Sequence, residues 1–270
     1  MKPSILTKPG PLVMGILNVT PDSFSDGGQF SHKNNAFEHA QRMLEEGADI
    51  IDIGGESTRP GAQAVSVQQE IRRVIPLVEA LQPLGVSISV DTSKTEVMSA
   101  AIDAGATMIN DVRALQADGA LEVIVDGQVD VCLMHMQGEP RTMQDAPYYI
   151  NVVKQVGDFL RERVNACVEA GIDKRRICLD PGIGFGKTLQ HNCQLLKHLY
   201  DLQIGDLPLL VGVSRKRMFE QILGLEVDKR MVASVAAGLI AVTKGAKILR
   251  VHDVKATKEA IEVYKAIEQH

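Results

Sequence analysis

The feature that most constrains this chain is a regular alternation of short apolar runs with longer segments of helical periodicity. The apolar runs lie at residues 12–17, 48–53, 86–90, 106–110, 129–134, 176–179, 207–213 and 246–251. About eight strand–helix units in about 250 residues have the size and rhythm of a (β/α)8 barrel. The sequence therefore predicts an α/β fold, a single TIM barrel domain over residues 1–270. A doubly wound sheet stays open as the alternative, because periodicity does not reveal closure.

Composition excludes several classes of protein. The 270 residues are 45% hydrophobic, enough for a full core, but no apolar run approaches the ~20 residues that span a bilayer. A net charge of -5 without a basic stripe argues against nucleic acid as a partner. The first residues lack the apolar stretch of a secretory signal. We expect a cytoplasmic protein with four buried free thiols, those of Cys132, Cys167, Cys178 and Cys193.

Polar groups stand at or just after nearly every predicted strand. They are Asn18, Asp52 with Glu56, Asp91, Asn110, His135, Asp180, Ser214 and His252. The carboxyl ends of barrel strands converge on the face where barrel enzymes keep their catalytic residues. The sequence therefore predicts that these side chains meet in one site. Within it, we interpret His135 as a structural histidine and Asp52 as a residue that orients its neighbours.

Loops and basic residues add to this predicted site. The segments GILNVTPDSFSDGG and GGESTRPG give the barrel long loops after strands 1 and 2, and long loops of this kind often act as lids. Ser214 to Lys216 lie where a helix is expected to begin, a position suited to an anion. Four residues add positive charge to this face: Arg59, Lys216, Arg250 and His252. They predict a small, negatively charged ligand, and a phosphate group is the one expected.

The stretch LDPGIGFGKT places a carboxylate, Asp180, at a strand end and a glycine-rich loop after it. A Walker loop would need glycine where Pro181 stands, and a dinucleotide loop would need glycine where Lys187 stands. Both nucleotide-binding interpretations are therefore weak. The glycines instead allow the backbone to turn away from a ligand while Phe185 lies beside it.

Seven motifs in order, MGILNVTPDSFSDGG, DIGGESTRPG, SVDTSK, MINDV, LDPGIGFGKT, GVSRK and RVHDV, resemble the dihydropteroate synthase family from about Met14 to Val254. The resemblance implies condensation of (7,8-dihydropterin-6-yl)methyl diphosphate with 4-aminobenzoate, by a dissociative route, to 7,8-dihydropteroate and diphosphate. It implies a transferase of folate biosynthesis that is a cytoplasmic homodimer and a sulfonamide target. It also implies Mg2+ as cofactor, held through Asn18.

The resemblance also implies a role for each matched residue. Catalytic roles fall to Asp91, Lys216, Arg250 and His252. Substrate binding is implied for these four and for Thr58, Arg59, Asn110, Asp180, Phe185 and Ser214. The pocket for the second substrate, 4-aminobenzoate, is implied to consist of Phe24, Thr58, Pro60, Phe185 and Ser214.

Two other functions remain as alternatives. The first is a pterin-dependent methyltransferase, an enzyme that resembles the synthase across the same barrel. The DSFSDGG and STRPG loops favour the synthase. A non-catalytic pterin-binding relative is expected to lose charged residues, yet Lys216, Arg250 and His252 are all present.

Overall fold

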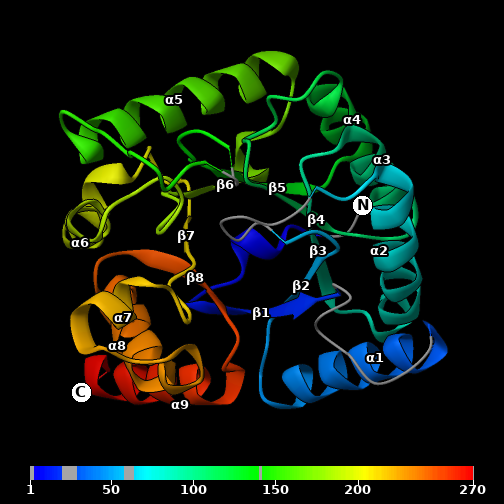
Figure 1. Cartoon of the computed structure of the whole chain (residues 1–270). Helices are drawn as coiled ribbons and strands as arrows, with labels where there is room; N and C mark the ends of the chain where they lie inside the picture. The colour runs from blue at the N-terminus through cyan, green and yellow to red at the C-terminus, as the bar shows by residue number, and fades with distance from the viewer. Residues whose placement is uncertain (1–2, 20–28, 58–63, 140–141, 270) are drawn as a thin grey trace.

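Eight parallel strands form a closed barrel in the computed structural model, which describes residues 3–19, 29–57, 64–139 and 142–269 (Figure 1). Each strand pairs with the next along the chain, and the first pairs with the last. The strands are β1 (Leu12–Asn18), β2 (Ile50–Gly54), β3 (Ser87–Asp91), β4 (Met108–Asp111), β5 (Asp130–Met134), β6 (Ile177–Asp180), β7 (Leu209–Val211) and β8 (Ala246–Val251). The predicted (β/α)8 barrel is confirmed, and the doubly wound alternative is wrong.

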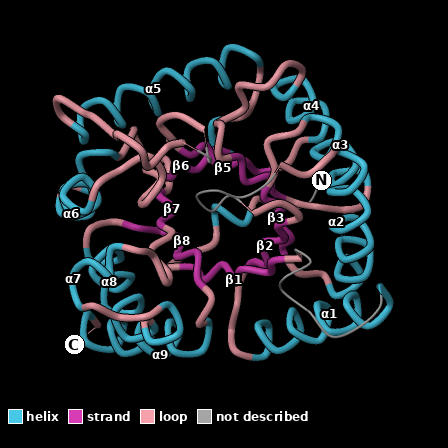
Figure 2. Tube along the Cα trace, in the orientation of Figure 1, coloured by secondary structure: helices cyan, strands magenta, loops and turns pink. Residues whose placement is uncertain are grey.

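Helices surround the barrel on all sides (Figure 2). They are α1 (Gln29–Glu45), α2 (Val67–Leu81), α3 (Thr95–Asp103), α4 (Ala120–Gly127), α5 (Val152–Ala170), α6 (Leu189–Lys197), α7 (Met218–Leu223), α8 (Met231–Thr243) and α9 (Val254–Glu268). Short 3-10 helices lie at Ile5–Thr7 (η1), Gln82–Leu84 (η3), Lys174–Arg176 (η4), Leu199–Leu202 (η5) and Val227–Lys229 (η6). None of the described helices is long and apolar enough to cross a membrane.

Local sequence explains where several helices begin and end. The Ser66 hydroxyl accepts a hydrogen bond from the Gln69 backbone, and the Gln69 side chain accepts one from Ser66, so a capping box starts α2. The Asn151 side chain caps α5, and Gly171 ends that helix in the left-handed conformation, with φ of 104°.

Apolar side chains fill the barrel interior below its carboxyl-terminal end. Because side chains alternate along a strand, Leu12 and Met14 of β1 face this interior core, whereas Val13 and Leu17 pack in the larger core that includes helix residues. The interior core also includes Leu6, Ile50, Met108, Cys132, Cys178, Leu210 and Ile248. The polar strand ends therefore lie above a packed apolar core.

The cysteine prediction holds for three of the four residues. Cys132, Cys167 and Cys178 are buried free thiols, whereas Cys193 is exposed on α6. For Cys193 the prediction is wrong, because an apolar neighbourhood in sequence does not determine which face of a helix packs on the barrel.

Candidate active site

Neighbouring strands bring Asn18, Asp91 and Asn110 into one row at the carboxyl-terminal end of the barrel. In the strand register, Asn18 lies opposite Gly54, Gly54 opposite Asp91, and Asp91 opposite Asn110. A Cβ atom on Gly54 would lie 3.5 Å from Asn18 Oδ1 and 3.9 Å from Asp91 Cβ, so the glycine leaves room between them. The structure thus brings these three predicted site residues together.

Arg250 of β8 joins two carboxylates across the barrel. Its Nε donates to Asp52 Oδ2 at 2.6 Å and its Nη2 donates to Asp91 Oδ2 at 2.7 Å. Asp52 is fully buried, and its Oδ2 also lies 3.5 Å from Asn110 Nδ2. Asp52 therefore contacts Arg250 and Asn110, and its role in orienting these neighbours stays a prediction.

Several buried oxygens at this end of the barrel have no hydrogen-bond partner among the described residues. They are Asp52 Oδ1, Ser89 Oγ, Asp91 Oδ1 and Asn110 Oδ1. A buried polar atom without a partner is costly, so such atoms are expected to bind water or a ligand. Oxygens from adjacent strands therefore suit a ligand that presents N–H donors.

The Asp180 carboxylate ends β6 and is 5% exposed. Its Oδ1 accepts a hydrogen bond of 2.7 Å from the Gly182 backbone N–H. Burial raises the pKa of Asp180 to about 6, against the opposing effects of the Gly182 bond and the Lys216 charge. Burial likewise raises the pKa of Asp91 to about 7, although the Arg250 guanidinium opposes the shift. Buried carboxylates with raised pKa values are typical of functional sites.

Lys216 and Phe185 meet at the edge of this site. The Lys216 Nζ lies 4.1 Å from the centroid of the Phe185 ring, a cation–π contact. A Cβ atom on Gly184 would come within 3.2 Å of Lys216 Cδ, so the glycine allows the lysine to lie against the loop. The structure therefore brings Asp180, Phe185 and Lys216 together from two predicted motifs.

Ser214 and His252 form a second contact, between the segments that follow β7 and β8. Ser214 Oγ accepts a hydrogen bond of 3.2 Å from the His252 backbone and lies 3.0 Å from His252 Nδ1. The expected helix start is wrong here. Helix α7 begins only at Met218, because residues after β7 first form a turn in which Arg215 adopts a positive φ of 56°.

A buried lysine, Lys187, is the feature that sequence reasoning missed. Its Nζ lies 3.0 Å from His135 Nδ1 and donates to the carbonyl oxygens of His135 at 3.3 Å and Phe185 at 2.9 Å. Burial lowers the pKa of Lys187 to about 7, and burial together with this lysine lowers the pKa of His135 to about 3. The only sequence signal was a lysine after a glycine-rich loop that matches no phosphate-binding pattern.

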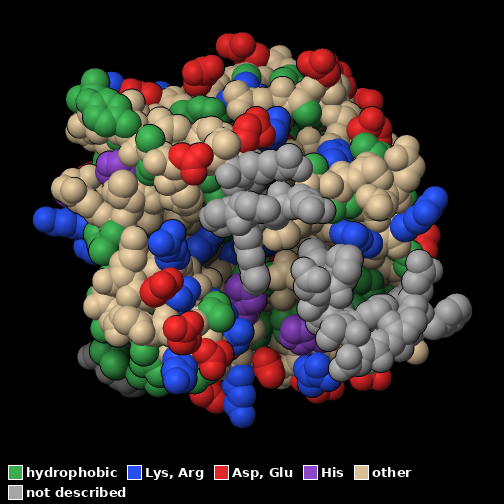
Figure 3. Space-filling view, viewed as in Figure 1, with side chains coloured by type: hydrophobic (Ala, Val, Ile, Leu, Met, Phe, Trp, Pro, Cys, Tyr) green, Lys and Arg blue, Asp and Glu red, His purple; other side chains and the backbone are tan. Residues whose placement is uncertain are grey.

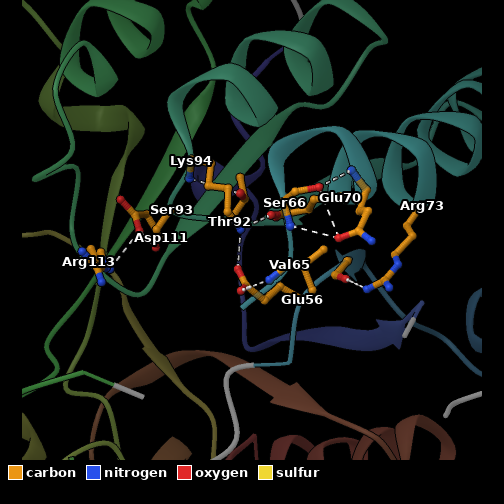
Figure 4. A network of polar contacts seen from close by, with 12 residues as sticks. Glu56, Val65, Ser66, Glu70, Arg73, Thr92, Ser93, Lys94, Asp111 and Arg113 are labelled. Atoms are coloured by element: carbon orange, nitrogen blue, oxygen red, sulfur yellow. Dashed lines mark hydrogen bonds and ion pairs between the residues drawn. The ribbon is translucent and has the colours of Figure 1, made fainter. Parts of the chain in front are cut away.

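A second ionic network lies beside the site (Figure 4). Lys94, which precedes α3, contacts Glu56 after β2 and the fully buried Glu70 of α2, each at 2.5 Å. Glu56 also accepts a hydrogen bond from the Val65 backbone at 2.9 Å. The network therefore joins the described ends of the β2–α2 connection to the strand end that carries Asp91.

Some predicted residues lie outside the described part of the chain. They are Phe24, Thr58, Arg59 and Pro60. Among the residues that the structure describes, basic and histidine side chains gather near the middle of the face shown in Figure 3. The same described residues contain no group of three His, Cys, Asp or Glu side chains that could hold a metal ion.

Known proteins share this sequence and this arrangement. The pterin binding enzyme family matches residues 14–252. The dihydropteroate synthase of Haemophilus influenzae is 55% identical over 258 residues, which cover 95% of this chain and 94% of that protein.

Solved structures agree. Yersinia pestis dihydropteroate synthase with a sulfonamide drug complex is 53% identical, has a TM-score of 0.92, and the match covers 97% of this chain and 95% of that chain. Xanthomonas albilineans dihydropteroate synthase with 4-aminobenzoic acid is also 53% identical, with a TM-score of 0.91 and coverages of 97% and 94%. The predicted resemblance is confirmed: this chain belongs to the pterin binding enzyme family, among the dihydropteroate synthases.

Proposed function

We propose that the protein is a transferase of folate biosynthesis that condenses (7,8-dihydropterin-6-yl)methyl diphosphate with 4-aminobenzoate, giving 7,8-dihydropteroate and diphosphate. The observation that carries the proposal is the convergence of Asp91, Asn110, Asp180 and Lys216 at one end of a barrel that matches dihydropteroate synthases over nearly its whole length.

The buried carboxylates and amide suit recognition of the pterin ring. The ring presents adjacent N–H donors, and an ionised carboxylate accepts two such bonds. We assign this role to Asp180, whose Oδ1 is already oriented by the Gly182 N–H. Asn110 offers both a donor and an acceptor, and Lys216 donates to the ring carbonyl and N5.

The reaction then breaks the bond between the methylene carbon and the diphosphate oxygen. The bonding electrons leave with diphosphate, and a pterin cation remains until the aminobenzoate nitrogen forms the new C–N bond and loses a proton. Asp91 offsets the cation, while Arg250 and His252 stabilise the leaving group. Arg250 uses Nε and Nη2 for Asp52 and Asp91, so we assign Nη1 to a diphosphate oxygen.

Mg2+ fits this site as an ion shared with the substrate. Asn18 ends β1 beside Gly54, and one amide oxygen is too little for a cage made of protein alone. Mg2+ commonly keeps several waters and binds through one or two protein ligands plus substrate phosphates. We therefore propose Asn18 as a ligand; when bound, the ion would neutralise negative charge on the diphosphate.

The 4-aminobenzoate pocket is proposed to include Phe185 as a wall and Ser214 as a partner for the carboxylate. Phe24, Thr58 and Pro60 are proposed to complete the pocket, with Thr58 and Arg59 also facing the diphosphate. A sulfonamide that mimics aminobenzoate would compete here.

The remaining proposals concern location and assembly. Buried free thiols, such as Cys132 and Cys178, suit a reducing compartment, so we place the protein in the cytoplasm. Exposed apolar side chains on α8 and α9 support a homodimer.

The test is to mix purified protein with the dihydropterin diphosphate and Mg2+, with and without 4-aminobenzoate, and to measure products by mass spectrometry. We expect dihydropteroate and diphosphate to form together, and only with aminobenzoate present. Asp180→Asn should abolish the reaction, because an amide nitrogen replaces an acceptor. Tight pterin binding without product would contradict the synthase, and methyl transfer to a corrinoid would then indicate the methyltransferase.

A further inference from the structure

The loop after β6 is held by side-chain hydrogen bonds to three consecutive carbonyl groups. Gln144 Nε2 donates to Gly184 O at 2.6 Å, Lys187 Nζ to Phe185 O at 2.9 Å, and Tyr149 Oη to Gly186 O at 3.0 Å. The Gly184 N–H is also bound, to Asn192 Oδ1 at 2.8 Å. A loop whose backbone is bound at each residue can hold Phe185 in one orientation.

Lys187 has a central place among these contacts. It is 3% exposed, and its Nζ also approaches His135 Nδ1 at 3.0 Å and His135 O at 3.3 Å. An ammonium group has three N–H donors, which match these two atoms and Phe185 O. Lys187 therefore ties the segment after β5 to the loop after β6.

The same lysine lies beside the backbone that orients Asp180. A Cβ atom on Gly182 would lie 3.4 Å from Lys187 Nζ and only 1.9 Å from His135 O. The Gly182 N–H is the donor to Asp180 Oδ1. One ammonium group thus contacts the backbone carbonyl oxygens of His135 and Phe185, next to Gly182, whose N–H orients Asp180.

We propose that Lys187 is a positioning residue of the reaction, which holds the Phe185 ring and the Asp180 carboxylate in one fixed relation by joining the carbonyl groups of His135 and Phe185. The inference rests on the proposed function where it is tested by the rate of the reaction. The measurement of pterin binding tests it without assuming that reaction.

The charge of Lys187 affects the pKa of Asp180, and a residue that acted only through packing would not have this effect. The charged and titratable groups around Lys187 and Asp180 include Lys216 after β7, Arg250 on β8, Cys132 on β5, His135 after β5 and His191 on α6. Lys187 is one of the charges that oppose the raised pKa of Asp180. Removing it should raise that pKa further, so pterin binding should weaken at a higher pH than in the wild type.

The test compares Lys187→Met with Gln144→Leu and Tyr149→Phe, which each remove one bond to the loop. Lys197→Met, an exposed lysine on α6, is the matched control. We expect kcat/KM for 4-aminobenzoate to fall by about 30-fold in Lys187→Met and by about 3-fold in each of the other two loop variants. The control should stay within about twofold of wild type.

Binding of 6-hydroxymethyl-7,8-dihydropterin by calorimetry from pH 5 to 8 supplies the second readout. Wild-type affinity should fall as pH drops through about 6, the pKa of Asp180, and the fall should begin at higher pH in Lys187→Met. Folded Lys187→Met with wild-type kinetics and an unmoved pH profile would overturn the proposal. If that variant does not fold, unchanged kinetics in both Gln144→Leu and Tyr149→Phe would overturn it.

The two proposals fail in different ways. Wild-type protein that binds the dihydropterin but forms no dihydropteroate would exclude the synthase. The pH profile of binding would still decide the role of Lys187.

Discussion

At the scale of the residue, folding removes most of the water around the Asp180 carboxylate, which suits the pterin-binding role proposed for it. Burial raises its pKa from 3.8 to about 6 in the folded protein. A carboxyl whose pKa is raised by folding stabilises the protein fully below its unfolded pKa. That contribution is lost as pH rises through the folded value. Asp180 therefore contributes least to the stability of the free protein at the pH values where it is ionised and can bind a pterin.

Asp180→Asn should consequently separate stability from function. The amide oxygen can still accept from the Gly182 N–H, whereas the buried negative charge is gone. We expect the free energy of unfolding at pH 8 to rise by about 1 to 3 kcal/mol, with little change at pH 4. Pterin binding should be lost at both pH values.

Urea unfolding at pH 4 and pH 8 measures this difference. Asp103→Asn, at an exposed position at the end of α3, is the control and should change the unfolding free energy by less than about 0.5 kcal/mol. Equal or lower stability of Asp180→Asn at pH 8 would contradict the argument.

At the scale of the element, the loop after β6 depends on glycines for close approach as well as for conformation. Gly182 and Gly224 have nearly equal positive φ values, 67° and 68°. A Cβ atom on Gly182 would lie 1.9 Å from the His135 carbonyl oxygen, whereas one on Gly224 would have no heavy atom within 4 Å among those described. Substitution at either glycine would therefore strain the backbone equally, but only at Gly182 would a side chain also collide with a neighbouring atom.

Gly182→Ala and Gly224→Ala form a matched pair. Gly224→Ala should cost about 1 kcal/mol of stability, from the left-handed conformation alone. Gly182→Ala should cost more, about 3 kcal/mol or above, or else displace the loop and reduce pterin affinity, because the alanine methyl group would overlap a carbonyl oxygen. Thermal unfolding and calorimetric pterin binding measure both effects. Similar losses in the two variants would mean that the close approach is unimportant.

The elements also show how far the sequence could be interpreted unaided. Short apolar runs predicted all eight strands, with β7 the least accurate: residues 207–213 were expected and Leu209–Val211 is observed. A register irregularity at Leu209 and Leu210 interrupts the pairing of β7 with β8 there, and periodicity cannot anticipate it. Helix α7 starts late for a similar reason, since a turn precedes Met218.

The placement of polar residues at the strand ends could be predicted where local position was enough. Asp91, Asn110 and Asp180 could be assigned because barrel topology gathers strand ends without knowledge of side-chain contacts. Lys187 could not, because its partner His135 is 52 residues away and is reached only through the packing of one loop on another. No local pattern distinguishes such a lysine from a solvated one.

At the scale of the whole molecule, the helices α8 and α9, at the lower left of Figure 1, carry exposed apolar side chains. Helix α8, MVASVAAGLIAVT, contains no charged residue, and Val232 and Ile240 on it are 74% and 52% exposed. On the adjoining α9, Val263 and Ile267 are 61% and 68% exposed. A helix without charged residues, such as α8, is usually buried on more than one side, so α8 and the exposed apolar residues of α9 fit a surface that a second copy of the chain covers.

Val232→Asp should therefore convert a dimer to a monomer, because it would bury one charge from each copy in the proposed apolar interface. Light scattering after size exclusion should give about twice 29.3 kDa for the wild type and 29.3 kDa for the variant. Ile150→Asp is the control, since Ile150 is 86% exposed just before α5, and that helix lies at the top of Figure 1, away from α8 and α9. A monomeric wild type at 10 times the assay concentration, or a dimeric Val232→Asp, would show that α8 is not the interface. Because the strand ends of one barrel already bring the site residues together, the monomer should keep its pterin affinity even where the dimer is lost.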